Sequence, residues 1–395
     1  MVKKILTLLI ILLVLVFIIL SIISLSYVKS ILNNEPIMIS EPLPTSQTQA
    51  TKIIEQPDIP LITVIAQNLD TPWAIAFLPA SSPGEISKLM LVTERAGRVR
   101  LVSFEVLLEP NPVATISSAR EIGEGGLLGI TIHPNFSSNN YVYLYYTFAG
   151  DDNQTLNRVV RMTYKNQKLE NEEIIVDRIP GAPNHNGGRI KFGPDGFLYI
   201  TTGDAQNPSL AQNTNTMAGK ILRVTDAGIP APGNPFDNAV FSYGHRNPQG
   251  LAWNENGELW STEHGRSGVL SGLDELNLIE VSKNYGWPTI QGDETRAGME
   301  TPKLNSGSDT WAPAGAAFIN NSLFFAGLRG QTLYEAVITN GEISLKEHFK
   351  TEFGRLREVV VGPDGMLYIT TSNRDGRGNP VPTDDKIIRV NPKKF

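Results

Sequence analysis

The chain contains no cysteine among its 395 residues, and it has no excess of basic residues. Without cysteine it cannot form disulfides, thiolate metal sites or iron–sulfur clusters. Its 34 lysines and arginines are outnumbered by 40 aspartates and glutamates, whereas a protein that binds nucleic acid through its phosphates normally carries a basic excess. The sequence also lacks HExxH, P-loop, GxGxxG and GxSxG motifs. These absences argue against a nucleic-acid partner and against several common classes of enzyme.

Charged residues are absent from residues 5–28, which are almost entirely apolar. As a helix this run would span roughly 36 Å, enough to cross a bilayer. Lys3 and Lys4 precede it and favour a cytoplasmic N-terminus. We therefore expect residues 1–30 to form a membrane anchor, with a cleaved signal peptide as the alternative, and the remainder of the chain to lie outside the cytoplasm.

The rest of the sequence shows almost no long helical periodicity. Residues 31–60 are rich in Pro, Ser and Thr and predict an extended linker. Short apolar runs follow, and six of them resemble one another; they begin at Leu89, Val142, Leu198, Leu259, Leu323 and Leu367. A β-rich unit of roughly fifty residues that recurs with turn signals is typical of propeller blades. We predict an all-β fold in which residues 61–395 form a six-bladed β-propeller of four-stranded antiparallel blades, with a pair of β-sandwiches as the alternative.

Polar residues in glycine-rich loops are candidates for a functional site, because packing does not require them there. His185 lies just before Gly187 and Gly188, where the backbone can approach a ligand closely. A histidine in such a loop can act as a general base, although a structural histidine is the alternative. Arg246 and Asn247 place a cation beside an amide, a pair that suits a ligand with carboxylates or quinone oxygens.

Two further arginines, Arg355 and Arg357, alternate along the start of a predicted strand and should therefore point to the same face. Two cations on one face repel each other unless an anion is present. An anionic ligand held by Arg246, Arg355 and Arg357 is the natural interpretation, unless Glu352 or Glu358 neutralises the pair locally.

Six longer motifs occur in an order that resembles a known family. They are LDTPWAIAFLP at 69–79, GEGGLLGITIHPNF at 123–136, HNGGRIKFGPDGFLYITTGDA at 185–205, YGHRNPQGLAW at 243–253, DELNLIEVSKNYGWP at 274–288 and GRLREVVVGPDGMLYITT at 354–371. From about residue 69 to 391 the chain resembles the glucose/sorbosone dehydrogenases, six-bladed propeller enzymes that use pyrroloquinoline quinone (PQQ), and among them the aldose sugar dehydrogenases. The resemblance implies oxidation of aldose sugars at the anomeric carbon to lactones.

The resemblance also implies roles for individual residues. His185 matches the catalytic base that takes the proton of the anomeric hydroxyl while a hydride passes to PQQ. Arg246 and Asn247 match the pair at the reacting edge of PQQ, and Arg355 and Arg357 match the arginines that hold its carboxylates. Two more cofactor contacts are implied, at Asp274 and Thr310.

Calcium is the second cofactor that the resemblance implies. One Ca²⁺ is expected on PQQ, where it takes backbone carbonyls from the loop 263–266, in particular those of Gly265 and Arg266. Further calcium is expected near Glu275 and Tyr285. The number of calcium sites stays open.

Four positions depart from the pattern of the glucose-oxidising members. Glu124 stands in place of a glutamine, Asn184 in place of the aspartate beside the catalytic histidine, Arg329 in place of a lysine that contacts the cofactor, and His264 in place of a glutamine in the calcium loop. Because these positions surround the cofactor, we expect the changes to alter substrate preference and cofactor affinity.

Two other functions stay open at the level of the sequence. A calcium-dependent lactonase on a similar propeller would need carboxylates along its channel rather than a cluster of arginines. A surface propeller that binds without catalysis would be favoured if PQQ did not bind. The preferred aldose, the membrane or soluble electron acceptor and the oligomeric state do not follow from the sequence.

Overall fold

The structure is a computed structural model that describes residues 59–395 apart from residues 81, 83–84, 86, 105–106 and 269–270. Residues 59–395 form one compact unit. The expected anchor at 1–30 and nearly all of the expected linker at 31–60 lie outside the described residues, so both stay predictions. Within the described ranges, no helix has both the length and the apolar character needed to cross a membrane.

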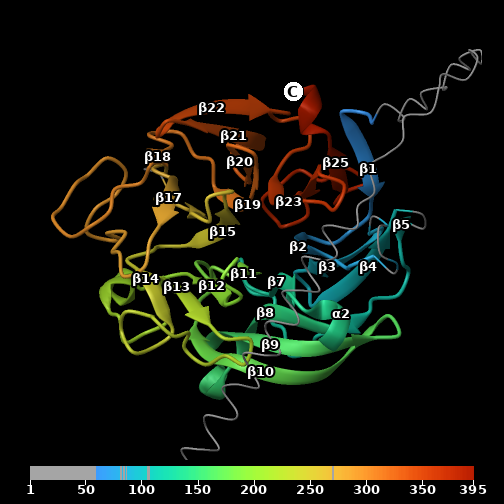
Figure 1. The fold of residues 1–395 in the computed structure, drawn as a ribbon, viewed down its shortest axis with the longest axis horizontal. Helices are drawn as coiled ribbons and strands as arrows, with labels where there is room; N and C mark the ends of the chain where they lie inside the picture. The colour runs from blue at the N-terminus through green and yellow to red at the C-terminus, as the bar shows by residue number, and fades with distance from the viewer. Residues whose placement is uncertain (1–58, 81, 83–84, 86, 105–106, 269–270) are drawn as a thin grey trace, which may run out of the picture. The chain divides into compact units, whose positions relative to one another are not determined.

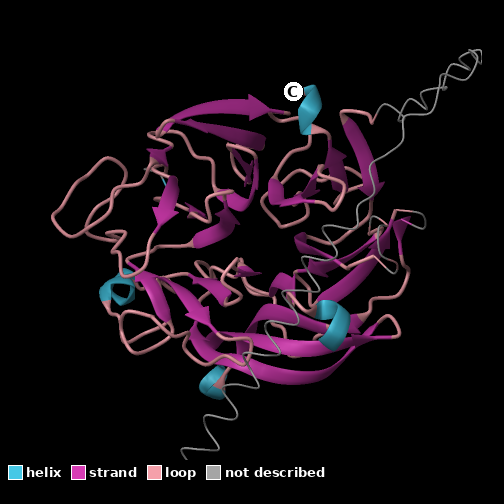
Figure 2. Ribbon diagram, viewed as in Figure 1, coloured by secondary structure: helices cyan, strands magenta, loops and turns pink. Residues whose placement is uncertain are grey.

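The compact unit consists of six antiparallel sheets that follow one another round a ring (Figure 1). This arrangement confirms the predicted six-bladed propeller and excludes the pair of sandwiches. Five sheets have four strands, and the first blade has an additional short strand. Strands and loops account for nearly all of the drawn unit, with only short helical pieces at its periphery (Figure 2).

Blade 1 contains β2 (Pro72–Phe77), β3 (Leu89–Glu94), β4 (Arg98–Ser103), β5 (Leu107–Leu108) and β6 (Ala114–Thr115). Blade 2 contains β7 (Leu127–Ile132), β8 (Tyr141–Ala149), β9 (Thr155–Lys165) and β10 (Lys168–Pro180). Blade 3 contains β11 (Ile190–Phe192), β12 (Leu198–Thr202), β13 (Lys220–Val224) and β14 (Val240–Tyr243).

Blade 4 contains β15 (Pro248–Trp253), β16 (Leu259–Glu263), β17 (Glu275–Ile279) and β18 (Leu304–Asn305). Blade 5 contains β19 (Pro313–Ile319), β20 (Ser322–Gly327), β21 (Thr332–Thr339) and β22 (Glu342–His348). Blade 6 contains β23 (Leu356–Val361), β24 (Leu367–Thr371), β25 (Ile387–Val390) and β1 (Ile62–Ala66). The helical pieces are α2 (Phe136–Asn139), η1 (Asp151–Asn153), η2 (Pro208–Gln212) and η4 (Pro392–Lys394).

The six similar runs of the sequence are the second strands of the six blades: β3, β8, β12, β16, β20 and β24. Glycines occupy the turns before three of these strands, and all three have positive φ: +80° for Gly196, +78° for Gly257 and +74° for Gly365. Each of these glycines donates its N–H to the carbonyl three residues earlier. The turn chemistry therefore sets where each second strand begins.

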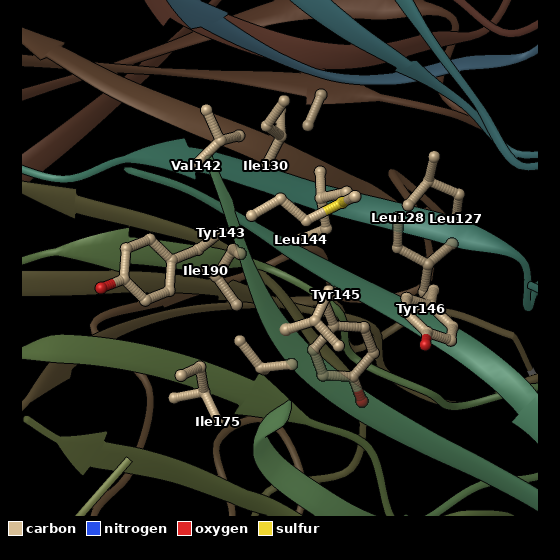
Figure 3. Packing of buried hydrophobic residues seen from close by; sticks show 14 of the residues in the cluster. Leu127, Leu128, Ile130, Val142, Tyr143, Leu144, Tyr145, Tyr146, Ile175 and Ile190 are labelled. Atoms are coloured by element: carbon tan, nitrogen blue, oxygen red, sulfur yellow. The ribbon is translucent and has the colours of Figure 1, made fainter. Parts of the chain in front are cut away.

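Burial on both faces explains why the strands are continuous apolar runs rather than alternating ones. Tyr143, Leu144, Tyr145 and Tyr146 follow one another along β8, and each is 0% exposed. Successive side chains of a strand point to opposite faces, so the blade is covered on both sides by its neighbours. Figure 3 shows these residues packed with side chains from the adjoining strands.

The ring is closed by strands from the two ends of the described chain. β1 pairs antiparallel with β25, and Thr63 lies opposite Arg389. Blade 6 therefore joins one strand from before blade 1 to three strands that follow blade 5.

The innermost strand of each blade is its first: β2, β7, β11, β15, β19 and β23 (Figure 1). The connections that lead into these strands lie at one end of the ring, together with the loops between the second and third strands of each blade. Residues far apart in the sequence thus meet at this end, where loops converge over the centre of the propeller.

Candidate active site

A cavity of about 460 Å³ opens at the end of the ring where the connections between blades lie. Six arginines line it, at positions 246, 266, 329, 355, 357 and 377, whereas the carboxylates that line it are those of Glu124 and Asp274. The cavity is therefore strongly cationic and suited to an anionic ligand. This distribution is the reverse of the carboxylate-lined channel that a calcium-dependent lactonase would need.

His185 lies on the wall of the cavity, in the connection between β10 and β11. Its Nδ1 is 2.8 Å from Oδ1 of Asp204, a carboxylate that is fully buried in the loop after β12. The other oxygen of Asp204 accepts a hydrogen bond of 2.8 Å from Nε1 of Trp287. With Nδ1 donating to Asp204, Nε2 of the neutral ring is the nitrogen left to accept a proton.

Arg246 and Asn247 directly precede β15, and the structure separates their environments. Arg246 lines the cavity, and its guanidinium donates to the carbonyl of His264 at 3.2 Å and to Oγ of Ser267 at 2.8 Å. Asn247 is fully buried behind the wall, where its Oδ1 accepts from the N–H of Gly187 at 2.9 Å. Asn247 therefore fixes the glycine loop that carries His185.

Arg355 and Arg357 point to the same face, as their spacing predicted, and both line the cavity. Their charges are balanced by an acid that the sequence reasoning did not find. Asp375 accepts from Nε and Nη2 of Arg355 at 3.0 and 2.8 Å, and it lies 3.9 Å from Nη2 of Arg357. Asp375 was not among the alternatives considered from the sequence, and Glu358, which was, pairs with Arg189 instead.

The charge of Arg357 survives its burial. Burial lowers the pKa of Arg357 to about 10, which still leaves the guanidinium protonated at neutral pH. Its hydrogen bonds go to the neutral oxygens of Gln249 and Ser372. A cation with mostly neutral partners retains the capacity to hold a carboxylate of a ligand.

Glu124 pairs with a cation from a different blade, Arg377 in the loop after β24. Oε1 of Glu124 is 2.6 Å from Nη1 of Arg377, and Nη2 of the same guanidinium donates to Oδ1 of Asn184 at 3.0 Å. Burial opposes the ionisation of Glu124, but attraction by His264 and the hydrogen bond from Arg377 lower its pKa to about 2. The negative charge of Glu124 is thus already paired.

Asp274 and Thr310 both line the cavity, yet their polar atoms are engaged by the protein. The carboxylate of Asp274 accepts three backbone N–H groups, from Gly265 at 2.8 Å, Trp311 at 2.7 Å and Ala312 at 2.9 Å. The hydroxyl of Thr310 donates to Oγ of Ser271 at 3.0 Å. Asp274 consequently joins the loop 263–266 to the connection before β19.

Two buried polar groups around the cavity have no partner among the residues that the structure describes. They are Nε2 of His264 and Nε of Arg266. Buried polar groups are normally satisfied by protein, water or a ligand, so these unpaired nitrogens are suited to polar groups of a ligand. Arg329 lines the same cavity with an exposed side chain. The set of cations and unpaired groups fits a ligand that carries several carboxylates and carbonyl oxygens.

Glu275 and Tyr285 lie outside the main cavity. Glu275 lines a small adjacent pocket together with Glu263, and its carboxylate accepts from Nδ2 of Asn277 at 3.0 Å. Burial and the charge of Glu263 raise the pKa of Glu275 to about 8. Tyr285 stacks on His245, with 4.7 Å between ring centroids.

Two amide oxygens near Glu275 are of the kind that can bind a hard cation. Oδ1 of Asn277 and Oε1 of Gln291 are buried and have no partner in the described part of the chain. Carboxylate and amide oxygens are the ligands that Ca²⁺ prefers. No cluster of three or more His, Asp or Glu side chains converges within the described ranges, so a cation here would also need backbone oxygens or water.

Three residues of this site were not predicted from the sequence: Asp204, Asp375 and Arg377. Asp204 ends the motif LYITTGD, directly after Gly203 and two residues beyond the end of β12. Asp375 and Arg377 lie in the loop after β24, where no motif marks them. Only the closed ring brings Arg377 next to residues that are 253 and 193 positions away in the sequence.

A propeller whose cavity combines a histidine–aspartate pair with six arginines is suited to chemistry on a small ligand held beside an anionic group. The family described as glucose/sorbosone dehydrogenase matches residues 69–388. The chain belongs to this family.

Relatives with assigned names extend the comparison. The chain is 29% identical to the aldose sugar dehydrogenase YliI of Escherichia coli, over 84% of this chain and 93% of that protein. It is 35% identical to quinoprotein glucose dehydrogenase B of Acinetobacter calcoaceticus, over 60% of this chain and 54% of that protein. The PQQ-bound aldose sugar dehydrogenase of Streptomyces coelicolor superposes with a TM-score of 0.76 at 36% identity, covering 83% of this chain and 97% of that one.

Proposed function

We propose that this protein oxidises aldose sugars at the anomeric carbon to lactones and that it uses PQQ and Ca²⁺. The observation that carries the proposal is the His185–Asp204 pair on the wall of a cavity lined by six arginines. The family membership and the PQQ-bound relative support the same activity. When bound, PQQ accepts the hydride, and Ca²⁺ polarises the quinone as a Lewis acid.

Three arginines of the cavity would provide most of the binding of the anionic cofactor. Arg355 and Arg357 would hold its carboxylates from blade 6, and Arg246 would meet its reacting edge from blade 4. Asp375 balances part of this positive charge and keeps the Arg355 guanidinium fixed by two hydrogen bonds. A fixed guanidinium loses little conformational freedom when a carboxylate binds. Gly265, Arg266 and Glu275 supply oxygens suited to Ca²⁺.

His185 performs the proton transfer. Its Nδ1–H bond to Asp204 orients the ring and leaves Nε2 facing the cavity as the acceptor for the proton of the anomeric hydroxyl. As that O–H bond breaks, the C–H bond of the anomeric carbon gives up its hydride and a carbonyl forms, which yields the lactone. Asp204 stabilises the imidazolium that results, because it is a buried carboxylate at 2.8 Å.

The location of the enzyme is part of the proposal. The uncharged run at 5–28, preceded by Lys3 and Lys4, supports an anchor in the cell membrane with the propeller outside the cytoplasm. A quinoprotein in that position would pass electrons to an acceptor in the membrane or in the surrounding medium.

The proposed function is tested with the full-length protein after chelation and removal of any bound cofactor. We expect PQQ to bind with 1:1 stoichiometry by absorbance titration, and PQQ with Ca²⁺ to confer dye reduction with aldoses. Arg355→Ala together with Arg357→Ala should weaken PQQ binding, because each lost charge-assisted contact costs about 1.5–3 kcal/mol.

Arg296→Ala is the matched control, since Arg296 is an exposed arginine that does not line the cavity. It should leave PQQ affinity unchanged. Equal affinity in the parent and the Arg355/Arg357 double variant would refute the assignment of the cofactor site. Binding of PQQ without any turnover of aldoses would refute the activity and favour a binding propeller.

A further inference from the structure

The guanidinium of Arg377 contacts two of the connections between blades at the edge of the cavity. Arg377 lies in the loop after β24 of blade 6. It contacts Glu124, in the connection between blades 1 and 2, at 2.6 Å, and Asn184, in the connection between blades 2 and 3, at 3.0 Å. All three residues line the cavity. The Arg377 side chain therefore links blade 6 to the two connections that flank blade 2.

Both partners of Arg377 lead directly to the catalytic histidine. Asn184 is the preceding residue in the sequence, and Oε2 of Glu124 accepts from the backbone N–H of His185 at 3.4 Å. His185 has a φ of 61°, a left-handed conformation that residues with a β-carbon disfavour. This backbone conformation must be held by its surroundings, and Glu124 and Asn184 are part of them.

The loop that carries Arg377 also contacts Arg355, one of the arginines expected to hold the cofactor, through Asp375. The N–H of Arg377 donates to Oδ1 of Asp375 at 2.9 Å, and Oδ2 of Asp375 accepts from Arg355. A continuous series of contacts thus runs from Arg355 through Asp375 and Arg377 to Glu124 and the backbone of His185. It connects the two groups whose relative position decides whether the sugar meets both base and hydride acceptor.

We propose that Arg377 is a positioning residue for His185, because it holds Glu124 and Asn184 at the edge of the cavity and so sets the orientation of the base. The inference rests on the proposed function. It assigns to Arg377 no direct contact with PQQ, so the effect of Arg377 on turnover is measured at saturating PQQ.

The test compares Arg377→Gln, Arg377→Lys and Glu124→Gln in the full-length protein. We expect Arg377→Gln to lower turnover roughly ten- to a hundredfold at saturating PQQ, because small displacements of a catalytic group have effects of this size. Arg377→Lys should recover part of the loss, since lysine keeps the charge but cannot span both partners. The Arg377→Gln, Glu124→Gln double variant should lose no more than the stronger single variant, because both act through one interaction.

A second measurement does not depend on activity. Amide hydrogen exchange of residues 182–188 in the cofactor-free protein should accelerate in Arg377→Gln. Arg374→Gln is the control, since Arg374 is an exposed arginine of the same loop whose hydrogen bonds go to the carbonyls of Asp384 and Pro382. It should change neither turnover nor exchange.

Unchanged exchange in residues 182–188, unchanged turnover at full loading, or additive losses in the double variant would each overturn the positioning role. Failure of the parent protein to oxidise any aldose would count against the proposed function instead. In that case the exchange measurement still decides whether Arg377 holds the His185 loop. If Arg377→Gln did not fold, Glu124→Gln and Arg377→Lys would supply the same comparison.

Discussion

The carboxylate of Asp204 determines which nitrogen of His185 can act as the base. We predict that Asp204→Asn lowers turnover about 100-fold or more, comparable with His185→Ala, while PQQ affinity stays the same. An asparagine amide can donate to Nδ1 and thereby place the proton on Nε2, which removes the acceptor from the cavity. Steady-state dye reduction at saturating PQQ measures the effect.

Asp195→Asn is the control for that substitution. Asp195 lies in the turn before β12, bonded to Tyr199 and Arg223, and it does not line the cavity. Near-normal turnover in Asp204→Asn would show that the tautomer of His185 is set by another group.

Ionisation of Glu124 makes the free energy of unfolding depend on pH in the acid range. The pKa of Glu124 is about 2 in the folded state, below the value near 4.3 in an unfolded chain. The ionised carboxylate therefore contributes fully to stability above about pH 4.3, and this contribution is lost as the pH falls toward 2. We predict that the difference in unfolding free energy between the parent and Glu124→Gln is constant from pH 7 to 5 and shrinks from pH 4.5 to 2. Urea unfolding at a series of pH values measures this difference. A difference that stays constant down to pH 2 would contradict the paired state of Glu124.

The residues found from the sequence are those that occur in loops with distinctive neighbours. His185 precedes a pair of glycines, and Arg355 and Arg357 alternate along a strand, so local pattern is sufficient to select them. Asp375 and Arg377 have no such pattern. Their role depends on the closure of a ring that places blade 6 beside the connections of blade 2, and single-sequence patterns contain no information about that distance.

At the scale of the strand, the packing of β1, which closes the ring with β25, can be tested by truncating one of its buried side chains. Ile65 on β1 is 7% exposed and packs in the core with Ile75, Met90 and Tyr368. We predict that Ile65→Ala lowers the unfolding free energy by about 2–4 kcal/mol, because it leaves a cavity in a closely packed core.

The neighbouring residue provides the control for this prediction. Val64 lies on the same strand and is 40% exposed, so Val64→Ala should change stability by less than about 1 kcal/mol. Urea denaturation of both variants makes the comparison. Equal losses would show that the inner face of β1 does not contribute more than its outer face.

The blades were predictable because one physical signal repeats along the chain. A tight turn followed by a continuous apolar run marks several of these second strands, and glycine occupies the turn before β12, β16 and β24. The outer strands are shorter or more polar, as β18 and β22 are, and their burial gives a weaker pattern. The pairing of β1 with β25 joins segments more than three hundred residues apart, and no local signal announces it.

At the scale of the whole molecule, the location of the propeller is the main prediction. Protease treatment of intact cells should remove the propeller and leave a small fragment embedded in the membrane, because an uncharged run of the length of 5–28 inserts while Lys3 and Lys4 stay inside. Immunoblotting with antibodies to each end of the chain measures the outcome. A soluble product that begins near residue 30 would indicate a cleaved signal peptide, and protection of the propeller would contradict export.

The sharing of blade 6 between β1 and β25 also sets the order of events during synthesis. A ribosome completes β1 early but must translate as far as Val390 before the partner strand exists. Until then β1 has no partner in its sheet, and the first five blades can form only an open arc. If the chain is exported as it is made, ring closure takes place on the far side of the membrane. In that case the cavity, which depends on contacts between blade 6 and the connections of blade 2, is completed there, and its ligands bind in that compartment.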